Sequence, residues 1–161
     1  MKIKSSVLSI ILFSTATTLT LSLNPAWSQD KSGSRINFLC KNTFDSASSE
    51  YLPPTLAWIP EQKKHRRIII WKSHYFRNRT PQERCQTVSQ DFQRFYDAGT
   101  LKYLTNGKLK GNPVICVVEE AGNKCNYENK LFQVKNYKIS EIILYRLIAI
   151  LVSASNEPLY Q

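Results

Sequence analysis

The sequence predicts an α+β fold: an antiparallel sheet of five or six short strands with two helices packed on it, stabilised by disulfides. Three observations predict this fold class. Short β-branched or aromatic runs alternate with turn residues, two longer segments have helical periodicity, and four cysteines follow an N-terminal segment typical of export. The elements are taken below in chain order.

Residues 1–28 are typical of a secretory signal peptide. Lys2 and Lys4 precede an apolar run at 7–13, and Ala26 and Ser28 are small residues at positions −3 and −1 of a cleavage site after Ser28. The alternative is an uncleaved membrane anchor. The second half of the segment is rich in Ser and Thr, however, and is too polar for a span of about 20 apolar residues. We therefore expect an exported protein in the periplasm, the cell envelope or the extracellular space.

Cleavage would leave 133 of the 161 residues, which suffices for one domain with its own core. We place a flexible lead-in at 29–35 and the domain at 36–156. Removal of Lys2 and Lys4 lowers the net charge from +10 to +8. No later apolar run reaches the length of a membrane span, so we expect a soluble or peripherally attached product.

Three strands are predicted in the first half, at 36–41, 56–59 and 68–76. The last begins Ile-Ile-Ile-Trp, a continuous apolar run that is typical of a strand covered on both faces. A polar loop at 42–51 is expected to join the first two strands. A charged connection, EQKKHRR at 61–67, is expected to join the second and third, with its side chains in water.

A helix is predicted at 81–97 from its start signal. Thr80 is placed to be the N-cap, Pro81 occupies the first helical position, and Glu83 can complete a capping box. An apolar stripe runs from Cys85 through Val88 and Phe92 to Phe95 and Tyr96. The sequence-based expectation for the opposite, water-facing side is Arg84, Gln90, Asp91 and Arg94. Gly99 then ends the helix.

The remaining elements are a hairpin, two strands and a second helix. The hairpin is expected at 101–110 with its turn at Asn106-Gly107, because Asn-Gly tolerates positive φ angles. A second turn signal at 111–112 precedes strands at 114–118 and 131–135, which are joined by a loop at 119–129. Ser140 is expected to cap a helix at 141–154, whose nearly all-round apolar surface indicates a buried packing helix.

The four cysteines are predicted to form two disulfides, since an even number in an exported chain is typical of bridges. Of the three possible pairings we predict Cys40–Cys85 and Cys116–Cys125. The first would join the first strand to the inner face of the first helix, and the second would tie a strand to its following loop. Zinc is the alternative, but close Cys/His spacing is absent.

Taken in order, these motifs resemble the circadian-oscillating-protein domain family of cyanobacteria. The resemblance covers almost all of the chain after residue 28. It rests on the following residues: Phe38-x-Cys40, Pro54-Thr55-x-Ala57, Trp71-x-Ser73-x-Tyr75-Phe76, Thr80-Pro81-Gln82-x-Arg84-Cys85-x-x-Val88-Ser89, Tyr103-Leu104-Thr105-x-Gly107, Pro113-Val114-Ile115-Cys116-Val117 and Leu131-Phe132. The connection KKHRR and the long loop around Cys125 depart from the family pattern. The resemblance implies an exported cyanobacterial domain without an established activity or known catalytic residues.

Catalytic chemistry finds little support in the residue pattern. A thiol enzyme would use Cys85, with His65 or His74 as base, and a small hydrolase could use His74. These two histidines have no metal-ligand spacing, and Glu119 and Glu120 would point to opposite faces of a strand. We expect no catalytic residue, metal or cofactor. The thiol enzyme and the hydrolase remain the alternative function.

The concentration of basic residues is the remaining feature that could indicate a function. Eight basic residues face two acidic ones between 61 and 84, with Trp71, Tyr75 and Phe76 interleaved. These aromatics could stack on a ligand, but we expect them in the core. The predicted surface consists of Lys63, Lys64, Arg66, Arg67, Lys108 and Lys110. We expect a non-catalytic domain that associates with an anionic envelope surface or a protein partner, and no nucleic acid.

Overall fold

The computed structural model describes residues 35–72, 76, 78–152 and 155–161. The predicted signal peptide at 1–28 and most of the predicted lead-in lie outside the described residues, as do His74 and Tyr75. The described part contains two helices, three groups of short, mostly antiparallel strands and two disulfides. The predicted α+β class is therefore confirmed.

The first sheet has the strand order β1-β4-β5-β9. It is made of β1 (Asn37–Cys40), β4 (Pro54–Ile59), β5 (Lys64–Ile70) and β9 (Leu159–Tyr160). The first three strands are antiparallel, whereas β9 pairs with β5 in parallel. The sequence predicted that the domain ends at 156. β9 lies beyond this position and is an edge strand of the sheet, so the domain extends further than predicted.

The polar segment at 42–51 is not a simple loop, as the sequence predicted, but holds a small hairpin. Its strands are β2 (Thr43–Asp45) and β3 (Glu50–Leu52). The turn is closed by Asp45, whose carboxylate accepts hydrogen bonds from the main-chain N–H of Ser48 (3.1 Å) and from its hydroxyl (2.7 Å). Such a local side-chain bond is a frequent way for Asp to build a turn.

The predicted connection at 61–67 was also wrong, because most of it is strand. A 3₁₀ turn (η2, Pro60–Gln62) ends at Lys63, and β5 begins at Lys64. Charged residues can occupy this strand because two of them have distant partners, which are described with the functional site. β5 ends at Ile70 instead of running on to 76.

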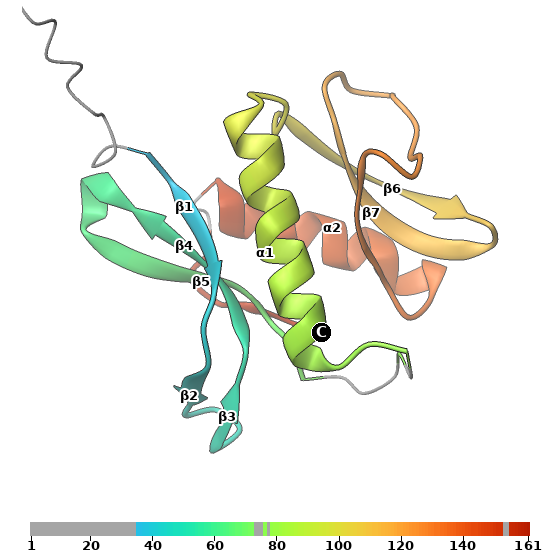
Figure 1. Cartoon of the computed structure of the whole chain (residues 1–161). Coiled ribbons are helices and arrows are strands. Elements are labelled where there is room, and N and C mark those ends of the chain that lie inside the picture. The colour runs from blue at the N-terminus through green and yellow to red at the C-terminus, as the bar shows by residue number, and fades with distance from the viewer. Residues whose placement is uncertain (1–34, 73–75, 77, 153–154) are drawn as a thin grey trace, which may run out of the picture. The chain divides into compact units, whose positions relative to one another are not determined.

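Helix α1 spans Pro81–Asp97, as predicted. The capping box is confirmed: the Glu83 N–H donates to Thr80 Oγ1 (3.2 Å), and the Thr80 N–H donates to Glu83 Oε2 (2.7 Å). α1 packs on β1 and β4 and also reaches β8 (Lys130–Gln133). In Figure 1 it lies between the first sheet on the left and the β6–β7 hairpin on the right.

The third group of strands is β6 (Tyr103–Leu109), β7 (Asn112–Val118) and β8. The predicted turn at Asn106-Gly107 was wrong, since both residues lie inside β6. The chain reverses instead at Lys110 (φ 47°) and Gly111 (φ 77°), a two-residue connection with two positive φ angles. Gly107 is required for another reason: a Cβ there would lie 2.9 Å from Cys125 Sγ.

Helix α2 spans Tyr137–Leu151 and starts earlier than predicted. Its N-cap is Asn136, whose side chain accepts a hydrogen bond from the Ile139 N–H (3.1 Å). Ser140, the predicted cap, lies within the helix and is fully buried. The helix is not buried all round either, because Ile142 and Tyr145 are exposed at 58% and 77%.

One hydrophobic core joins the sheets and helices. Helix α2 packs on β6 and β7 and contacts β5 and β9, so the two helices together connect the first and third sheets. Both predicted disulfides are confirmed. Cys40–Cys85 links β1 to α1, and Cys116–Cys125 links β7 to the loop before β8. Among the described residues, no helix is both long and apolar enough to span a bilayer.

Candidate functional site

The six predicted basic residues do not form one surface. Lys63 and Lys64 are exposed at the β4–β5 turn, and Lys108 and Lys110 are exposed near the β6–β7 turn. Figure 1 shows these two hairpin ends on opposite sides of the fold. Lys108 Nζ lies 4.5 Å from the ring centroid of Tyr137, so its charge is held against the start of α2.

Two of the predicted ligand-binding arginines instead hold the fold together. Arg66 is 9% exposed, and its Nη1 donates to the main-chain oxygen of Ile150 (3.1 Å) in the last turn of α2. Arg67 donates to the Phe44 carbonyl oxygen (3.1 Å) and forms an ion pair with the buried Asp45 carboxylate (3.5 Å). The expectation that these side chains project into water without core contacts was therefore wrong.

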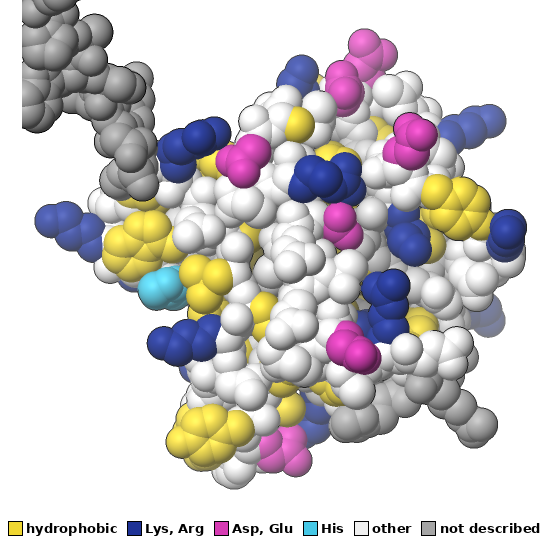
Figure 2. Space-filling model, viewed as in Figure 1, with side chains coloured by type: hydrophobic (Ala, Val, Ile, Leu, Met, Phe, Trp, Pro, Cys, Tyr) yellow, Lys and Arg dark blue, Asp and Glu magenta, His cyan; other side chains and the backbone are white. Residues whose placement is uncertain are grey.

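The end of the β4–β5 hairpin combines basic and aromatic side chains. The rings of Trp58 and His65 lie 4.9 Å apart on neighbouring strands, and Trp58 is only half-buried. Lys63 and Lys64 follow directly on the turn. Figure 2 shows hydrophobic and basic side chains side by side over this hairpin, at the left edge of the view. We call Trp58, Lys63, Lys64 and His65 the hairpin tip.

The alternative hypothesis of a thiol enzyme is wrong, because its proposed nucleophile, Cys85, is not a free thiol. Cys85 is fully buried and bonded to Cys40, and no cysteine of the chain is free. A disulfide sulfur has no thiolate to offer as nucleophile. His74, the other predicted candidate, lies outside the described residues. Trp71 is fully buried in the core, as the sequence predicted for this aromatic.

A cavity of about 870 Å³ lies between α1 and the third sheet. Four cations line it, against one carboxylate, Asp91, and we call it the basic cavity. On the face seen in Figure 2, basic side chains lie to the right of α1 with acidic side chains between them. The lining residues are Phe76, Asn78, Arg79, Arg84, Thr87, Val88, Asp91, Arg94, Asn112, Tyr127, Lys130, Leu131, Phe132 and Gln133.

Arg84 is the most buried cation of this cavity, at 6% exposure. Its guanidinium carbon lies 4.5 Å from the Trp71 ring centroid and 4.4 Å from that of Phe76, so the planar group is held between two aromatic faces. Burial lowers the pKa of Arg84 to about 10. The side chain therefore still carries its charge at neutral pH, in a place from which water is largely removed.

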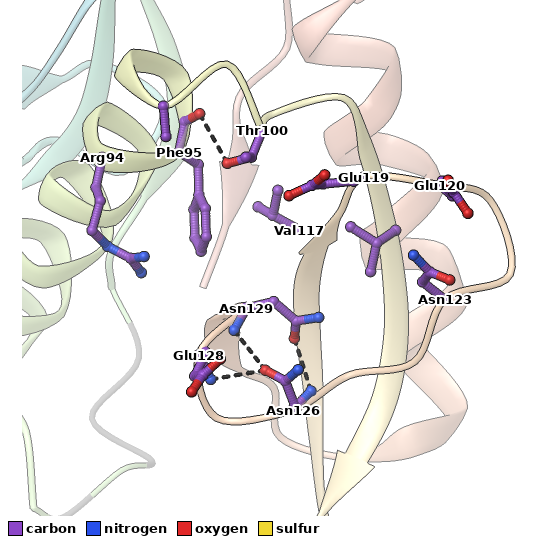
Figure 3. A pocket seen from close by; sticks show the side chains of 12 residues that line it. Arg94, Phe95, Thr100, Val117, Glu119, Glu120, Asn123, Asn126, Glu128 and Asn129 are labelled. Atoms are coloured by element: carbon purple, nitrogen blue, oxygen red, sulfur yellow. Dashed lines mark hydrogen bonds between the residues drawn. The ribbon is translucent and has the colours of Figure 1, made fainter.

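A second cavity, of about 550 Å³, lies beside the loop at 119–129. Figure 3 shows Arg94 and Phe95 of α1 on one side and Asn126, Glu128 and Asn129 on the other. Asn126 and Asn129 hold the loop, since each side-chain oxygen accepts a main-chain N–H of the other residue (2.9 and 2.8 Å). We call this the amide-lined cavity.

Carboxylates also border the amide-lined cavity but do not converge. β7 ends at Val118, and in Figure 3 the side chains of Glu119 and Glu120 point in different directions. Within the described residues, no three His, Cys, Asp or Glu side chains are placed to share a metal ion.

The sequence-based interpretation missed the basic cavity because it assigned Arg84 to water. Arg84 precedes Phe95 by eleven residues, which is close to three helical turns, so the two side chains point in nearly the same direction from α1. Since Phe95 was assigned to the apolar stripe, the same spacing indicated burial of Arg84. Of the other cations of the cavity, Arg79 and Lys130 are too far apart in sequence for any local pattern to indicate that they lie together.

The chain matches no curated protein and no solved structure. One family model does match, over residues 37–161, which includes every helix and strand described above. The family is that of the circadian oscillating protein COP23, to which this chain therefore belongs.

Proposed function

We propose that this protein is an exported, non-catalytic domain that associates peripherally with an anionic membrane surface through the hairpin tip. The observation that carries the proposal is the pairing of the half-buried Trp58 with His65 directly beside exposed Lys63 and Lys64. Trp side chains favour the headgroup level of a bilayer, where the ring meets both apolar and polar groups. Lysines near an anionic surface contribute about 1 kcal/mol each.

Further support comes from the charge and from the state of the cysteines. The sequence has 22 basic and 12 acidic residues, and the cations of the hairpin tip are not engaged in any of the ion pairs found among the described residues. Two disulfides are typical of an oxidising compartment. Attraction of this kind is electrostatic and should weaken as salt shortens the screening length below about 10 Å.

Co-sedimentation with vesicles tests the proposal. The wild-type protein should bind vesicles that contain phosphatidylglycerol and should leave vesicles of phosphatidylcholine in the supernatant. The double variant Lys63→Glu/Lys64→Glu should lose this binding. Arg66 and Arg67 are left unchanged, because both hold the fold together.

The matched control is Lys102→Glu/Lys124→Glu, which changes the net charge equally at two exposed positions outside the hairpin tip. It should retain most of the binding. Equal loss in both variants would mean that overall charge, and not the hairpin tip, attracts the protein. Retained binding in Lys63→Glu/Lys64→Glu would refute the proposed surface. Trp58→Ala should weaken binding by a similar factor at low and at high salt, because the contribution of an uncharged ring is not screened.

A further inference from the structure

The strand β7 lies between β6 and β8, and its hydrogen bonds show which of its residues face each neighbour. The Val117 N–H donates to the Asn129 carbonyl oxygen, and the Pro113 carbonyl oxygen accepts from the Val134 N–H, both at 2.9 Å. Asn129 and Val134 directly flank β8. Since the direction of main-chain groups alternates along a strand, the odd-numbered residues of β7 bond to β8 and the even-numbered ones to β6.

The register of the β6–β7 pair then gives the direction of each main-chain group of β6. Thr105 lies opposite Cys116, so its N–H and carbonyl groups bond to β7. The residues whose main-chain groups point away from β7 are Leu104, Asn106 and Lys108. No hydrogen bond to these groups is found from elsewhere in the described residues. We call the N–H and carbonyl groups of these three residues the β6 edge.

The outer edge of the first sheet, by contrast, is covered. There α1 supplies side-chain acceptors: Gln93 Oε1 accepts the Phe38 N–H (2.7 Å), and Tyr96 Oη accepts the Ile36 N–H (3.4 Å). Edge strands are also commonly protected by a bulge, a proline or a very short length. β6 has none of these, since it is seven residues long, contains no proline and pairs with β7 without a shift of register.

The β6 edge is held in an extended form by contacts on its other sides. Asn106 Nδ2 donates to Ser140 Oγ of α2 (2.8 Å), and Lys108 Nζ lies 4.5 Å from the ring centroid of Tyr137. These contacts place the side chains of Asn106 and Lys108 on the face of the sheet that α2 covers. A strand that is already ordered loses little conformational freedom when another strand is added to it, which favours binding.

The charge near the turn of this hairpin is positive. No acidic residue occurs between 101 and 118, whereas Lys108 and Lys110 lie at the turn end of β6. Lys110 Nζ lies 5.8 Å from the ring centroid of Tyr127. Neither lysine belongs to any of the ion pairs found among the described residues. An acidic strand added here would therefore gain electrostatic attraction.

A second copy of this chain fits the β6 edge poorly. In the symmetric antiparallel registers centred on 105 or 106, Lys102 would lie opposite Lys108 or Lys110 of the second copy. Like charges directly opposite each other destabilise a strand pair, and lysine is a common protection of edges against such pairing. The same lysines that oppose a second copy favour an acidic partner.

We propose that the β6 edge binds an extended, acidic segment of another polypeptide, which adds a strand to the third sheet. Main-chain hydrogen bonds to Leu104, Asn106 and Lys108 provide the affinity. Successive side chains of a strand point to opposite faces, so every second residue of the segment lies on the face that α2 covers. Acidic residues at these positions lie beside Lys108. The hairpin tip is not involved, so this binding is independent of the proposed membrane association.

Amide hydrogen exchange, followed by NMR on the disulfide-bonded protein, tests the proposal. The probe is a synthetic peptide in which Glu alternates with Val. In the free protein the amides of Leu104, Asn106 and Lys108 should exchange faster than those of Thr105 and Gly107, which bond to β7. The peptide at about 5 mM should slow exchange of the first three by about tenfold or more and leave the other two unchanged.

A second peptide of the same sequence with N-methylated main-chain amides keeps the charge but loses the donors, and should protect none of these amides. Lys108→Pro removes an N–H of the β6 edge and leaves the bonds to β7 in place. Its matched control is Lys108→Gln, which removes the same charge and keeps that N–H. Lys108→Pro should abolish the protection of Leu104 and Asn106, whereas Lys108→Gln should only weaken it. Thermal unfolding of both variants shows whether the fold is retained.

The proposal is overturned if the peptide leaves the three amides of the β6 edge unprotected, or if folded Lys108→Pro is protected as the wild type is. Equal protection by the N-methylated peptide would mean that charge alone attracts it. Protection without peptide that grows with protein concentration would assign the β6 edge to a second copy. Lys63→Glu/Lys64→Glu should bind the peptide as the wild type does, so loss of vesicle binding alone would affect only the proposed function.

Discussion

Arg66 Nη1 donates a hydrogen bond to the carbonyl oxygen of Ile150, 3.1 Å away, and thereby ties the middle of β5 to the last turn of α2. The helix end lacks basic side chains of its own. Arg66 supplies the positive charge that the carbonyl groups at a helix C-terminus attract. A residue in the most basic part of the sequence thus serves the packing of two distant elements.

Arg66→Ala should lower the free energy of unfolding by about 1–3 kcal/mol, because a buried carbonyl group loses a charged donor. Urea denaturation is the measurement. The control Lys64→Ala changes an exposed residue of the same strand and should stay within about 0.5 kcal/mol of the wild type. Equal midpoints for both variants would mean that the bond to Ile150 contributes nothing to stability.

Thr80→Ala should destabilise the protein by about 1 kcal/mol, because it removes the side-chain half of the capping box. Glu83→Gln should cost less, since an amide oxygen can still accept the bond from the Thr80 N–H. Chemical denaturation of the two variants provides the comparison. A larger loss for Glu83→Gln than for Thr80→Ala would contradict this account of the helix start.

Removal of the Cys40–Cys85 disulfide by paired alanines should cost more stability than removal of Cys116–Cys125. The first closes a sequence separation of 45 residues and the second one of 9. The chain-entropy model gives about 4 and about 2.5 kcal/mol for loops of these lengths. Urea unfolding under non-reducing conditions measures both. The opposite ranking would show that packing around the bridges, and not loop length, determines their contribution.

Gly107→Ala should destabilise the disulfide-bonded protein by about 1–3 kcal/mol, a cost typical of overpacking. The new Cβ would lie 2.9 Å from both the Cβ and the Sγ of Cys125, which the bridge holds in place. In a Cys116→Ser/Cys125→Ser background the loop can move away, so the same substitution should cost clearly less. A double-mutant cycle measures the difference, and an equal cost in both backgrounds would exclude this coupling.

Asp45→Asn should destabilise the protein most at neutral pH. The Ser48 hydroxyl bond, with help from Tyr160 and Arg67, lowers the pKa of the Asp45 carboxyl in the folded state. A carboxyl whose folded pKa is lowered adds stability above the unfolded pKa of about 3.9, and that stability is lost as the pH falls through the folded value. The difference between wild type and variant should therefore shrink below about pH 4 in denaturation curves.

Tyr160→Phe tests the contribution of the Asp45 carboxylate by removing a hydroxyl that donates to it from a distant part of the sequence. Its hydroxyl donates to Asp45 Oδ1 at 3.1 Å, so the substitution should give a smaller difference from wild type with the same pH trend. A difference that does not change between pH 7 and pH 3 would mean that the tyrosine acts by packing alone.

Local signals in the sequence predicted α1 and its cap, because the N-cap, the proline and the returning Glu83 lie within four consecutive residues. Both disulfides were also predicted, since Cys85 lies on the apolar stripe of α1 and Cys125 follows Cys116 closely. The prediction of a turn at Asn-Gly was wrong because the glycine at 107 leaves space for the side chain of Cys125, a contact distant in sequence. The positive φ angles of the observed turn belong to Lys110 and Gly111.

The basic residues were harder to assign because their partners are remote. Arg66 bonds to a residue 84 positions away, and Arg67 to one 22 positions away. No pattern in the segment at 61–67 contains those partners, so a run of charges was interpreted as a solvated connection. The basic cavity depends on the same kind of long-range approach, between α1 and the strand β8.

The parallel strand β9 also has a consequence for the newly made chain. β9 lies on β5, the Gln161 N–H donates to the Ile70 carbonyl oxygen (2.8 Å), and Tyr160 reaches Asp45. Synthesis proceeds from the N-terminus, so β5 gains its second neighbour only after residues 159–161 have left the ribosome. Until then that edge has unpaired main-chain groups, which are prone to pairing with other chains. The first sheet is thus completed only after the intervening elements, from α1 to α2, have been synthesised.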